Sequence, residues 1–157
     1  MSDTSIRYKN ITFDDRDTKH LRYSGDWFKN GTWNASHVGQ TGTLASSNSP
    51  NAMVTFDFPV PANGFFYYGI PRSHGGLYAI CIDCNPDEQH FEDIDALNYT
   101  DDGNNPPRPK VLLYHRWFGL PGHHTVILKN QQDTRIYEDG NSQITLDRFE
   151  LQVDDIN

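Results

Sequence analysis

The sequence is short of basic residues, of cysteine and of long apolar runs. Of its 157 residues, 13 are Lys or Arg and 21 are Asp or Glu, which gives a net charge of −8. Proteins that bind nucleic acid or anionic membranes need a basic surface, so we expect neither partner. No apolar segment approaches the roughly 18 residues that span a bilayer, so we expect no membrane insertion by this chain.

The first residues lack the charged-then-apolar pattern of a secretory signal peptide. This leaves two expectations for location, a cytoplasmic protein or the mature domain of an extracellular one. Four N-x-S/T sequons favour the second, because such sites are glycosylated on extracellular surfaces. Accidental sequons in a chain rich in Asn, Ser and Thr are the alternative. The sequons begin at Asn10, Asn30, Asn34 and Asn98.

The only two cysteines, Cys81 and Cys84, form a CxxC motif. Redox motifs of this kind open a helix after a strand, whereas this one closes an expected strand and runs into the turn residues Asn85–Asp87. A zinc site would need two further soft ligands, and no second CxxC is present. The residues therefore leave open a local structural disulfide or two free thiols.

Helical periodicity is nearly absent, because no window of about eleven residues keeps an apolar stripe free of Gly and Pro. Twelve Gly and nine Pro punctuate the chain instead. Apolar residues alternate within short segments bounded by turn residues, which predicts β-strands. The expected strands are Ile11–Asp14, Met53–Phe58, Phe65–Tyr68, Leu77–Asp83, Val111–Trp117, Thr125–Lys129 and Ile144–Val153.

Strands joined by short turns, without intervening helices, predict an all-β fold, an antiparallel sandwich or barrel. We expect one domain over residues 11–153, an N-terminal extension over 1–10 and a tail over 154–157. In the last strand the apolar face changes between Leu146 and Phe149. A β-bulge at Asp147–Arg148 and burial on both faces are alternative explanations.

Five segments together resemble a known family. They are Ile11–Asp15, Arg22–Trp27, Gly76–Asp83, Gly122–Leu128 and Ile144–Glu150. In this order they resemble the extracellular jelly-roll domains of basidiomycete fungal surface proteins, and they are more distantly similar to galactose-binding-like carbohydrate-binding modules. The resemblance implies a jelly-roll β-sandwich, an extracellular or cell-surface location and a lectin-like role.

In carbohydrate-binding modules of this kind, one structural calcium ion often joins the first strand to the last. The resemblance implies Asp14 or Asp15, together with Asp147, as its ligands, which are the hard oxygen donors that calcium prefers. The opening strand departs from the family pattern because it lacks the usual two glutamates. Ordinary surface or turn-capping aspartates are the alternative.

Glycan binding needs aromatic rings that stack on sugar faces and fixed polar groups that select hydroxyl positions. Two stretches, 26–51 and 85–109, are expected to be long loops, where binding residues usually lie on a β-scaffold. For each aromatic candidate, burial in the core is the alternative, and for the Arg and His candidates it is a solvated hairpin tip. The candidates are Trp33, Arg72, His74, Tyr99, Asp102 and Trp117.

The sequence carries no nucleophile elbow, phosphate-binding Gly-rich loop or zinc-protease motif, so we do not expect an enzyme. His123 and His124 are adjacent and would face opposite sides of a strand, so we expect no shared metal there. The leading hypothesis is a non-catalytic, lectin-like module whose partner is a glycan or glycoconjugate. A protein-interaction or sensor ectodomain, and a polysaccharide lyase or glycoside hydrolase, are the alternatives.

Overall fold

The structure is a computed structural model, and it describes residues 7–35, 40–85, 87–88, 90–99, 110–135, 138–140 and 142–155. These residues form strands, turns and loops only, and the expected antiparallel β-sandwich is confirmed. Within these ranges there is no helix with the length and apolar character that a membrane crossing requires.

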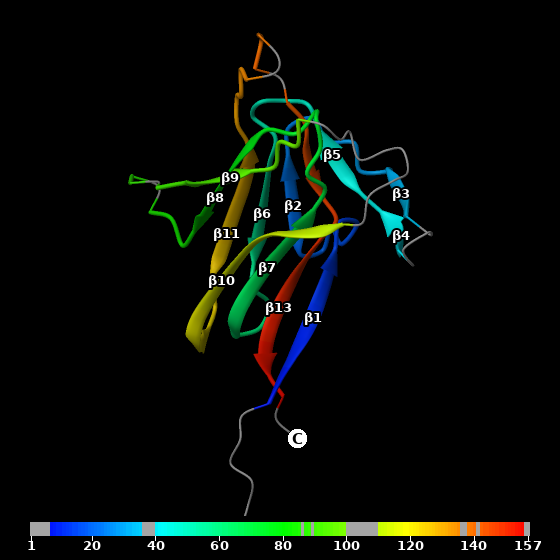
Figure 1. Cartoon of the computed structure of the whole chain (residues 1–157). Helices are drawn as coiled ribbons and strands as arrows, with labels where there is room; N and C mark the ends of the chain where they lie inside the picture. Colours follow the sequence, from blue (N-terminus) through cyan, green and yellow to red (C-terminus); the bar gives the residue numbers. More distant parts are fainter. Residues whose placement is uncertain are drawn as a thin grey trace, which may run out of the picture.

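Two larger sheets and two short strand pairs make up the fold (Figure 1). The four-stranded sheet has the order β1 (Tyr8–Asp14), β13 (Arg148–Asp154), β7 (Ala62–Gly69), β10 (Val111–Gly122). The five-stranded sheet has the order β2 (Leu21–Ser24), β6 (Met53–Asp57), β11 (Thr125–Asn130), β8 (Leu77–Ile82), β9 (Glu92–Asp95). The short pairs are β5 (Ala45–Ser47) with β12 (Ile144–Leu146), and β3 (Thr32–Ala35) with β4 (Gln40–Thr43).

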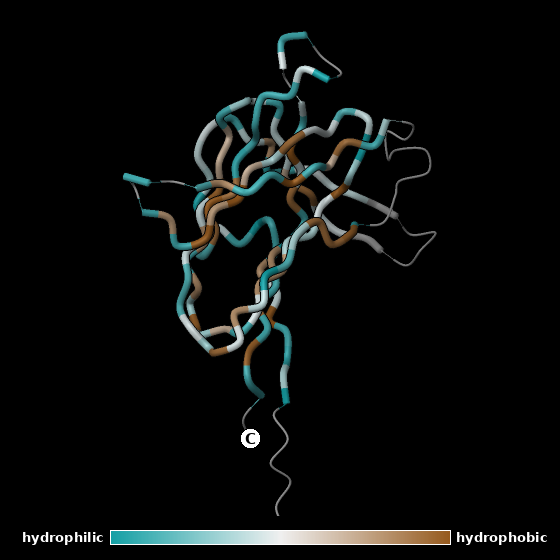
Figure 2. The backbone as a smooth tube through the Cα atoms, turned by 60° about the vertical axis from the view of Figure 1, so that its left-hand side comes forward, coloured by the Kyte–Doolittle hydropathy of each residue, from teal (hydrophilic) through white to brown (hydrophobic). Residues whose placement is uncertain are grey.

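Aromatic rings fill the space between the two larger sheets. Phe56 of β6 stacks on Phe149 of β13 with ring centroids 5.3 Å apart, and Phe65 of β7 lies 5.1 Å from Phe149. All three rings are fully buried. Figure 2 shows hydrophobic residues concentrated along the central strands, whereas the loop drawn at the top is hydrophilic. Alternate residues of the central strands therefore enter one shared core, as sandwich packing requires.

Several strands extend beyond their expected limits. The first strand begins at Tyr8 and the last ends at Asp154, so the sandwich includes residues assigned to the extension and the tail. Strand β10 continues past Trp117 to Gly122. The expected loop over 26–51 contains β3, β4 and β5, and the loop over 85–109 contains β9; residues 100–109 of it lie outside the described ranges.

The expected last strand is divided at Asp147. Strand β12 before it pairs with β5, whereas β13 after it pairs with β1 and β7. The amide of Asp147 donates to the carbonyl of Tyr68 at 2.9 Å, and its own carbonyl accepts from the amide of Asp15 at 3.0 Å. The chain thus changes sheets at this residue. This transfer moves the buried face between Leu146 and Phe149. Burial of Thr145, Asp147 and Glu150 also agrees with the second expected explanation, a segment buried on both faces.

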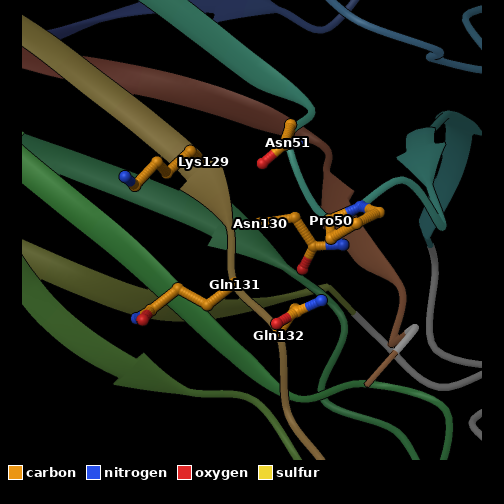
Figure 3. A pocket seen from close by; sticks show the side chains of 6 residues that line it. All are labelled: Pro50, Asn51, Lys129, Asn130, Gln131 and Gln132. Atoms are coloured by element: carbon orange, nitrogen blue, oxygen red, sulfur yellow. The ribbon is translucent and has the colours of Figure 1, made fainter. Parts of the chain in front are cut away.

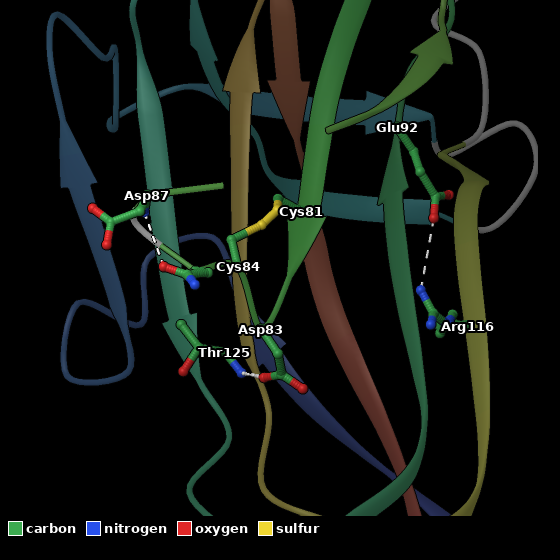
Figure 4. The surroundings of a disulfide bond; sticks show 8 residues. Cys81, Asp83, Cys84, Asp87, Glu92, Arg116 and Thr125 are labelled. Atoms are coloured by element: carbon green, nitrogen blue, oxygen red, sulfur yellow. Dashed lines mark hydrogen bonds and ion pairs between the residues drawn. A yellow bond between two sulfur atoms is a disulfide. The ribbon is translucent and has the colours of Figure 1, made fainter. Parts of the chain in front are cut away.

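Cys81 and Cys84 form a disulfide at the end of β8 (Figure 4). Asp83, inside the loop that it closes, has a φ of 57°, a left-handed conformation that Asp tolerates better than most residues. Its carboxylate accepts a hydrogen bond from the amide of Thr125 at 2.8 Å and pairs with His124. The alternative of free thiols is therefore wrong for this structure.

Arg135 fastens the loop after β11 to β9. Its guanidinium donates to both oxygens of Asp95, at 2.9 and 2.7 Å, and to Asp133 at 2.6 Å. These hydrogen bonds hold the pKa of Asp95 and the pKa of Asp133 below their ordinary value of 3.8. Each carboxylate stabilises the fold through the cation while it is ionised, so the contribution disappears only when both are protonated.

Truncating the central ring of the core should destabilise the protein strongly. We expect Phe149→Ala to lower the free energy of unfolding by about 3–5 kcal/mol, because it leaves a cavity between the sheets. The matched control is Phe28→Ala, since Phe28 is 60% exposed, with an expected change of about 0.5 kcal/mol or less. Urea denaturation measures both, and equal losses would contradict the assigned core.

Replacing Arg135 should reduce stability in a pH-dependent way. A carboxyl whose pKa is lowered by folding stabilises the fold above its unfolded pKa, and this contribution is lost as pH falls through the folded value. We expect Arg135→Gln to cost about 1 kcal/mol near neutral pH and nothing once both aspartates are protonated. The control Arg22→Gln removes a single exposed pair with Asp57 and should cost less. Urea midpoints between about pH 7 and pH 2 compare them, and a pH-independent difference would refute the assignment.

Candidate functional site

Trp33 does not offer a ring to solvent. It is 8% exposed and packs with Leu44 and Ile70 in a small core separate from the main one. The guanidinium of Arg72 lies 5.9 Å from the centre of its ring. The expectation of an exposed stacking face at Trp33 is therefore wrong, and the burial alternative holds, because the β3–β4 pair folds this residue inward.

Arg72 is likewise buried, and it ties loops together. Its Nη1 donates to Oε1 of Gln143 at 2.7 Å, and its backbone pairs with Ala96 and Asn98, both at 3.1 Å. The expected rim position, open to a ligand, is wrong for its side chain. The structure does bring Trp33 and Arg72 together, as expected, but in a packing role.

The remaining loop candidates differ in what the structure describes. His74, in the loop after Arg72, and Tyr99, after β9, are both exposed. Asp102 lies outside the described residues. A binding role for His74, Tyr99 and Asp102 stays a prediction.

Trp117 is an expected site residue that presents an open ring on the surface of a sheet. It is 50% exposed on the outer face of the four-stranded sheet. A Cβ added to Gly64 of β7 would lie 3.3 Å from Cε3 of Trp117, so the indole rests against a strand backbone that has no side chain there. Tyr8, 40% exposed, meets the indole edge-on with ring centroids 5.5 Å apart. The ring is thus supported from below and from one side.

Strand register places further groups beside this ring. Residues directly opposite one another on paired strands share a face of the sheet. One row across the four strands therefore consists of Asn10, Gln152, Gly64 and Trp117. The next row consists of Thr12, Glu150, Phe66 and His115, in which the rings of Phe66 and His115 stack at 6.2 Å. We call Tyr8, Phe66, His115 and Trp117 the aromatic platform.

Polar groups border the aromatic platform. The side-chain amide of Gln152 makes no hydrogen bond within the described part of the chain. Gln152 lies between Asn10 and Gly64 on the paired strands. Glu150 accepts from Nδ2 of Asn10 at 3.2 Å and from Nε of Arg148 at 2.6 Å. One free carboxamide and one ordered carboxylate thus lie next to exposed rings.

Sequence reasoning missed most of this face. Tyr8 fell in the presumed extension, and Phe66 was expected in a strand without an assignment to either face. The alternation of inward and outward side chains along the neighbouring strands could have revealed this face. Because Leu151 faces the core, Gln152 must face outward. That rule also puts Phe66 outside once Phe65 is inside.

The three candidate calcium ligands lie near one another but have other partners. Asp147 is buried, and its two oxygens contact Nζ of Lys110 at 2.9 Å and Nη1 of Arg148 at 2.5 Å. Oδ1 of Asp15 accepts from the hydroxyl of Thr43. Two cationic side chains therefore already neutralise the carboxylate expected to anchor the ion.

For Asp15, burial changes the acidity of the carboxyl group. Burial raises its pKa to about 7, and its Oδ2 accepts no hydrogen bond from the described residues. Asp14 is exposed, and its carboxylate accepts a hydrogen bond from the backbone N–H of Arg16 at 3.1 Å. Among the described residues there is no group of three or more His, Cys, Asp or Glu placed to hold a metal. Calcium binding by these three aspartates stays a prediction, and the ion would have to compete with the partners that they have here.

Comparison with known proteins adds information about the fold. No protein-family profile matches the sequence, and no curated protein matches it. A family two carbohydrate esterase from Cellvibrio japonicus superposes with a TM-score of 0.59 at 15% identity, over 94% of this chain and 34% of the esterase. A two-domain esterase active on acetylated mannans gives 0.55 at 14% identity, over 95% and 38%.

A third solved structure is matched nearly end to end. The CBM36-1 domain of a multidomain xylanase from the hindgut metagenome of Trinervitermes trinervoides gives a TM-score of 0.50 at 13% identity, over 91% of this chain and 96% of that domain. The fold is a jelly roll like that of carbohydrate-binding modules. At these identities the likeness concerns the fold alone, and none of the three supports the expected kinship with basidiomycete surface proteins.

Stability should depend on Lys110 and be insensitive to chelators. We expect Lys110→Met to cost about 3 kcal/mol, because it leaves the buried Asp147 with one cation in place of two. The control Lys9→Met removes a contact of 3.8 Å at the surface and should change little. Thermal unfolding of the native protein with and without EDTA completes the test. A melting temperature that falls by more than about 2 °C in EDTA would restore calcium as a ligand.

Proposed function

We propose that this domain is a non-catalytic glycan-binding module that holds a polysaccharide chain against the aromatic platform. The observation that carries the proposal is the exposed indole of Trp117, seated against Gly64 and next to the free amide of Gln152. Glycan binding requires an aromatic surface and fixed polar groups. The fixed group beside these rings is the carboxylate of Glu150, which Asn10 and Arg148 hold in place.

The physical argument rests on the shape of the ligand. One face of a pyranose ring is rich in C–H groups and packs against an aromatic ring, and its rim carries hydroxyls that pair with amides. The platform lies on the open face of a sheet, which suits an extended chain better than a single sugar. The strands beneath it are anchored in the core, so binding need not order a loop.

The comparisons support the proposal from a different direction. The xylanase domain that this chain matches over 96% of its length is a carbohydrate-binding module by its description. The two esterases are longer than this chain, which spans 34% and 38% of them. A domain of this size and fold therefore accompanies carbohydrate-active enzymes as one part of a larger chain.

We place the domain at the cell surface or outside the cell. The disulfide between Cys81 and Cys84 supports this, because disulfides persist in oxidising compartments. The sequon residue Asn30 is exposed and accessible for modification. At the platform no bond is made or broken, so we expect no turnover of any polysaccharide.

The test is to remove the indole. We expect Trp117→Ala to weaken polysaccharide binding about 30-fold, the equivalent of about 2 kcal/mol of lost apolar contact. Trp117→Phe should keep part of the affinity. Phe28→Ala is the matched control, since it removes an exposed ring that is not part of the platform. Affinity electrophoresis and calorimetry with xylan, mannan, β-glucan and chitin provide the measurement.

Two outcomes would contradict glycan binding at the platform. One is a native protein that binds none of these polysaccharides, which would favour a protein-interaction role for the same face. The other is a Trp117→Ala variant that binds as tightly as the native protein. Release of reducing sugar from any of the substrates would contradict the non-catalytic assignment.

A further inference from the structure

A pocket of about 370 Å³ lies where β11 ends, against the turn that precedes β6. It is lined by Pro50, Asn51, Lys129, Asn130, Gln131 and Gln132 (Figure 3). These residues belong to the five-stranded sheet and its loops, whereas the aromatic platform lies on the four-stranded sheet. The pocket is therefore separate from the proposed polysaccharide site.

One wall of the pocket is a buried amide with an unused acceptor. Asn130 is 1% exposed, and its Nδ2 donates to the carbonyls of Ser49 at 3.1 Å and Ser142 at 2.8 Å. Its Oδ1 accepts no hydrogen bond from the part of the chain that the structure describes. A buried acceptor without a donor is unfavourable, so the fold leaves one polar atom unsatisfied directly behind the pocket lining.

Two other carboxamides of the lining are available as well. Asn51 and Gln132 are exposed, and their amide groups make no hydrogen bond to other described residues. Each can donate and accept at the same time. These two exposed carboxamides offer neutral hydrogen-bonding groups to the same space.

The rest of the lining is held in place by contacts within the fold. The backbone N–H of Asn130 donates to the carbonyl of Ala52 at 2.9 Å. Nε2 of Gln131 donates to Asp93 at 2.6 Å and to the carbonyl of Tyr78 at 3.1 Å. The ammonium of Lys129 lies 4.1 Å from the centre of the Phe91 ring, a favourable cation–π contact. The pocket is thus already formed without a ligand.

These groups indicate the class of ligand. Neutral carboxamides that both donate and accept pair well with adjacent hydroxyls, whereas an acidic ligand would be opposed by the net charge of −8. The lining contains no aromatic ring, so a sugar would be held by its edge and not by its face. The volume is at the small end of ligand sites, which run from about 300 to 1,000 Å³.

We propose that this pocket binds the adjacent hydroxyls of a single sugar residue edge-on, as a second glycan subsite. The choice of a sugar among neutral polyols rests on the proposed function; the neutral, hydroxyl-bearing class rests on the carboxamides of the lining and on the net charge of −8. A chain end or branch would enter here while the body of a polysaccharide lies on the platform or on another molecule of the domain.

The test is an NMR titration of the full ¹⁵N-labelled chain with D-glucose, D-mannose, D-galactose and D-xylose. We expect saturable shifts of the side-chain amides of Asn51 and Gln132 and of the backbone amide of Asn130 with at least one sugar. The double variant Asn51→Ala/Gln132→Ala should weaken that binding at least about tenfold. Asn30→Ala removes an exposed amide elsewhere and should leave the titration unchanged.

The same titration on Trp117→Ala separates the two proposals. Pocket shifts that persist in this variant, while polysaccharide binding is lost, support both sites. Pocket shifts in a native protein that binds no polysaccharide overturn the platform and keep the pocket. No saturable shift with any of the four sugars at about 100 mM, or shifts that the double variant leaves unchanged, overturn the pocket.

Discussion

The packing of Phe56, Phe65 and Phe149 between the two larger sheets determines which residues every neighbouring strand can present to solvent. Side chains alternate along a strand, so each buried ring commits the next residue to the opposite face. With Phe65 inside, Phe66 must lie outside. A shift of one residue in the strand pairing would move every side chain of the strand to the opposite face. The free energy of burying these rings opposes such a shift. The outer aromatic surface is thus a consequence of the core.

This dependence explains what could be predicted about the fold. Alternation of Val54, Phe56 and Phe58 correctly indicated a strand with one buried face. Turn residues without helical periodicity correctly indicated an antiparallel sandwich. The transfer of the chain between sheets at Asp147 could not be predicted, because Ile144 and Leu146 before it are as fully buried as Phe149 and Leu151 after it. Composition does not distinguish two buried half-strands from one.

The functional residues were harder to predict for a related reason. Trp33 stands in a segment rich in Gly and Asn, which suggested an exposed loop, yet contacts with Ile70 and Leu44 bury it. Trp117 was a correct choice of exposed ring. The seat of the Trp117 indole depends on Gly64, which is distant in sequence and becomes adjacent only through strand pairing. The pairing of Lys110 with Asp147 is equally non-local, and the family resemblance alone pointed to a metal instead.

The pairing of β1 with β13 has a mechanical consequence. Tyr8 lies opposite Asp154, so both strands end at the same corner of the sandwich, as the blue and red arrows of Figure 1 show. A force that pulls these two ends apart opens the antiparallel ladder one hydrogen-bonded pair at a time, from that corner inward. The first residue displaced is Tyr8, which supports the indole of Trp117. Tension along the chain would therefore loosen the edge of the aromatic platform before it disturbs the core.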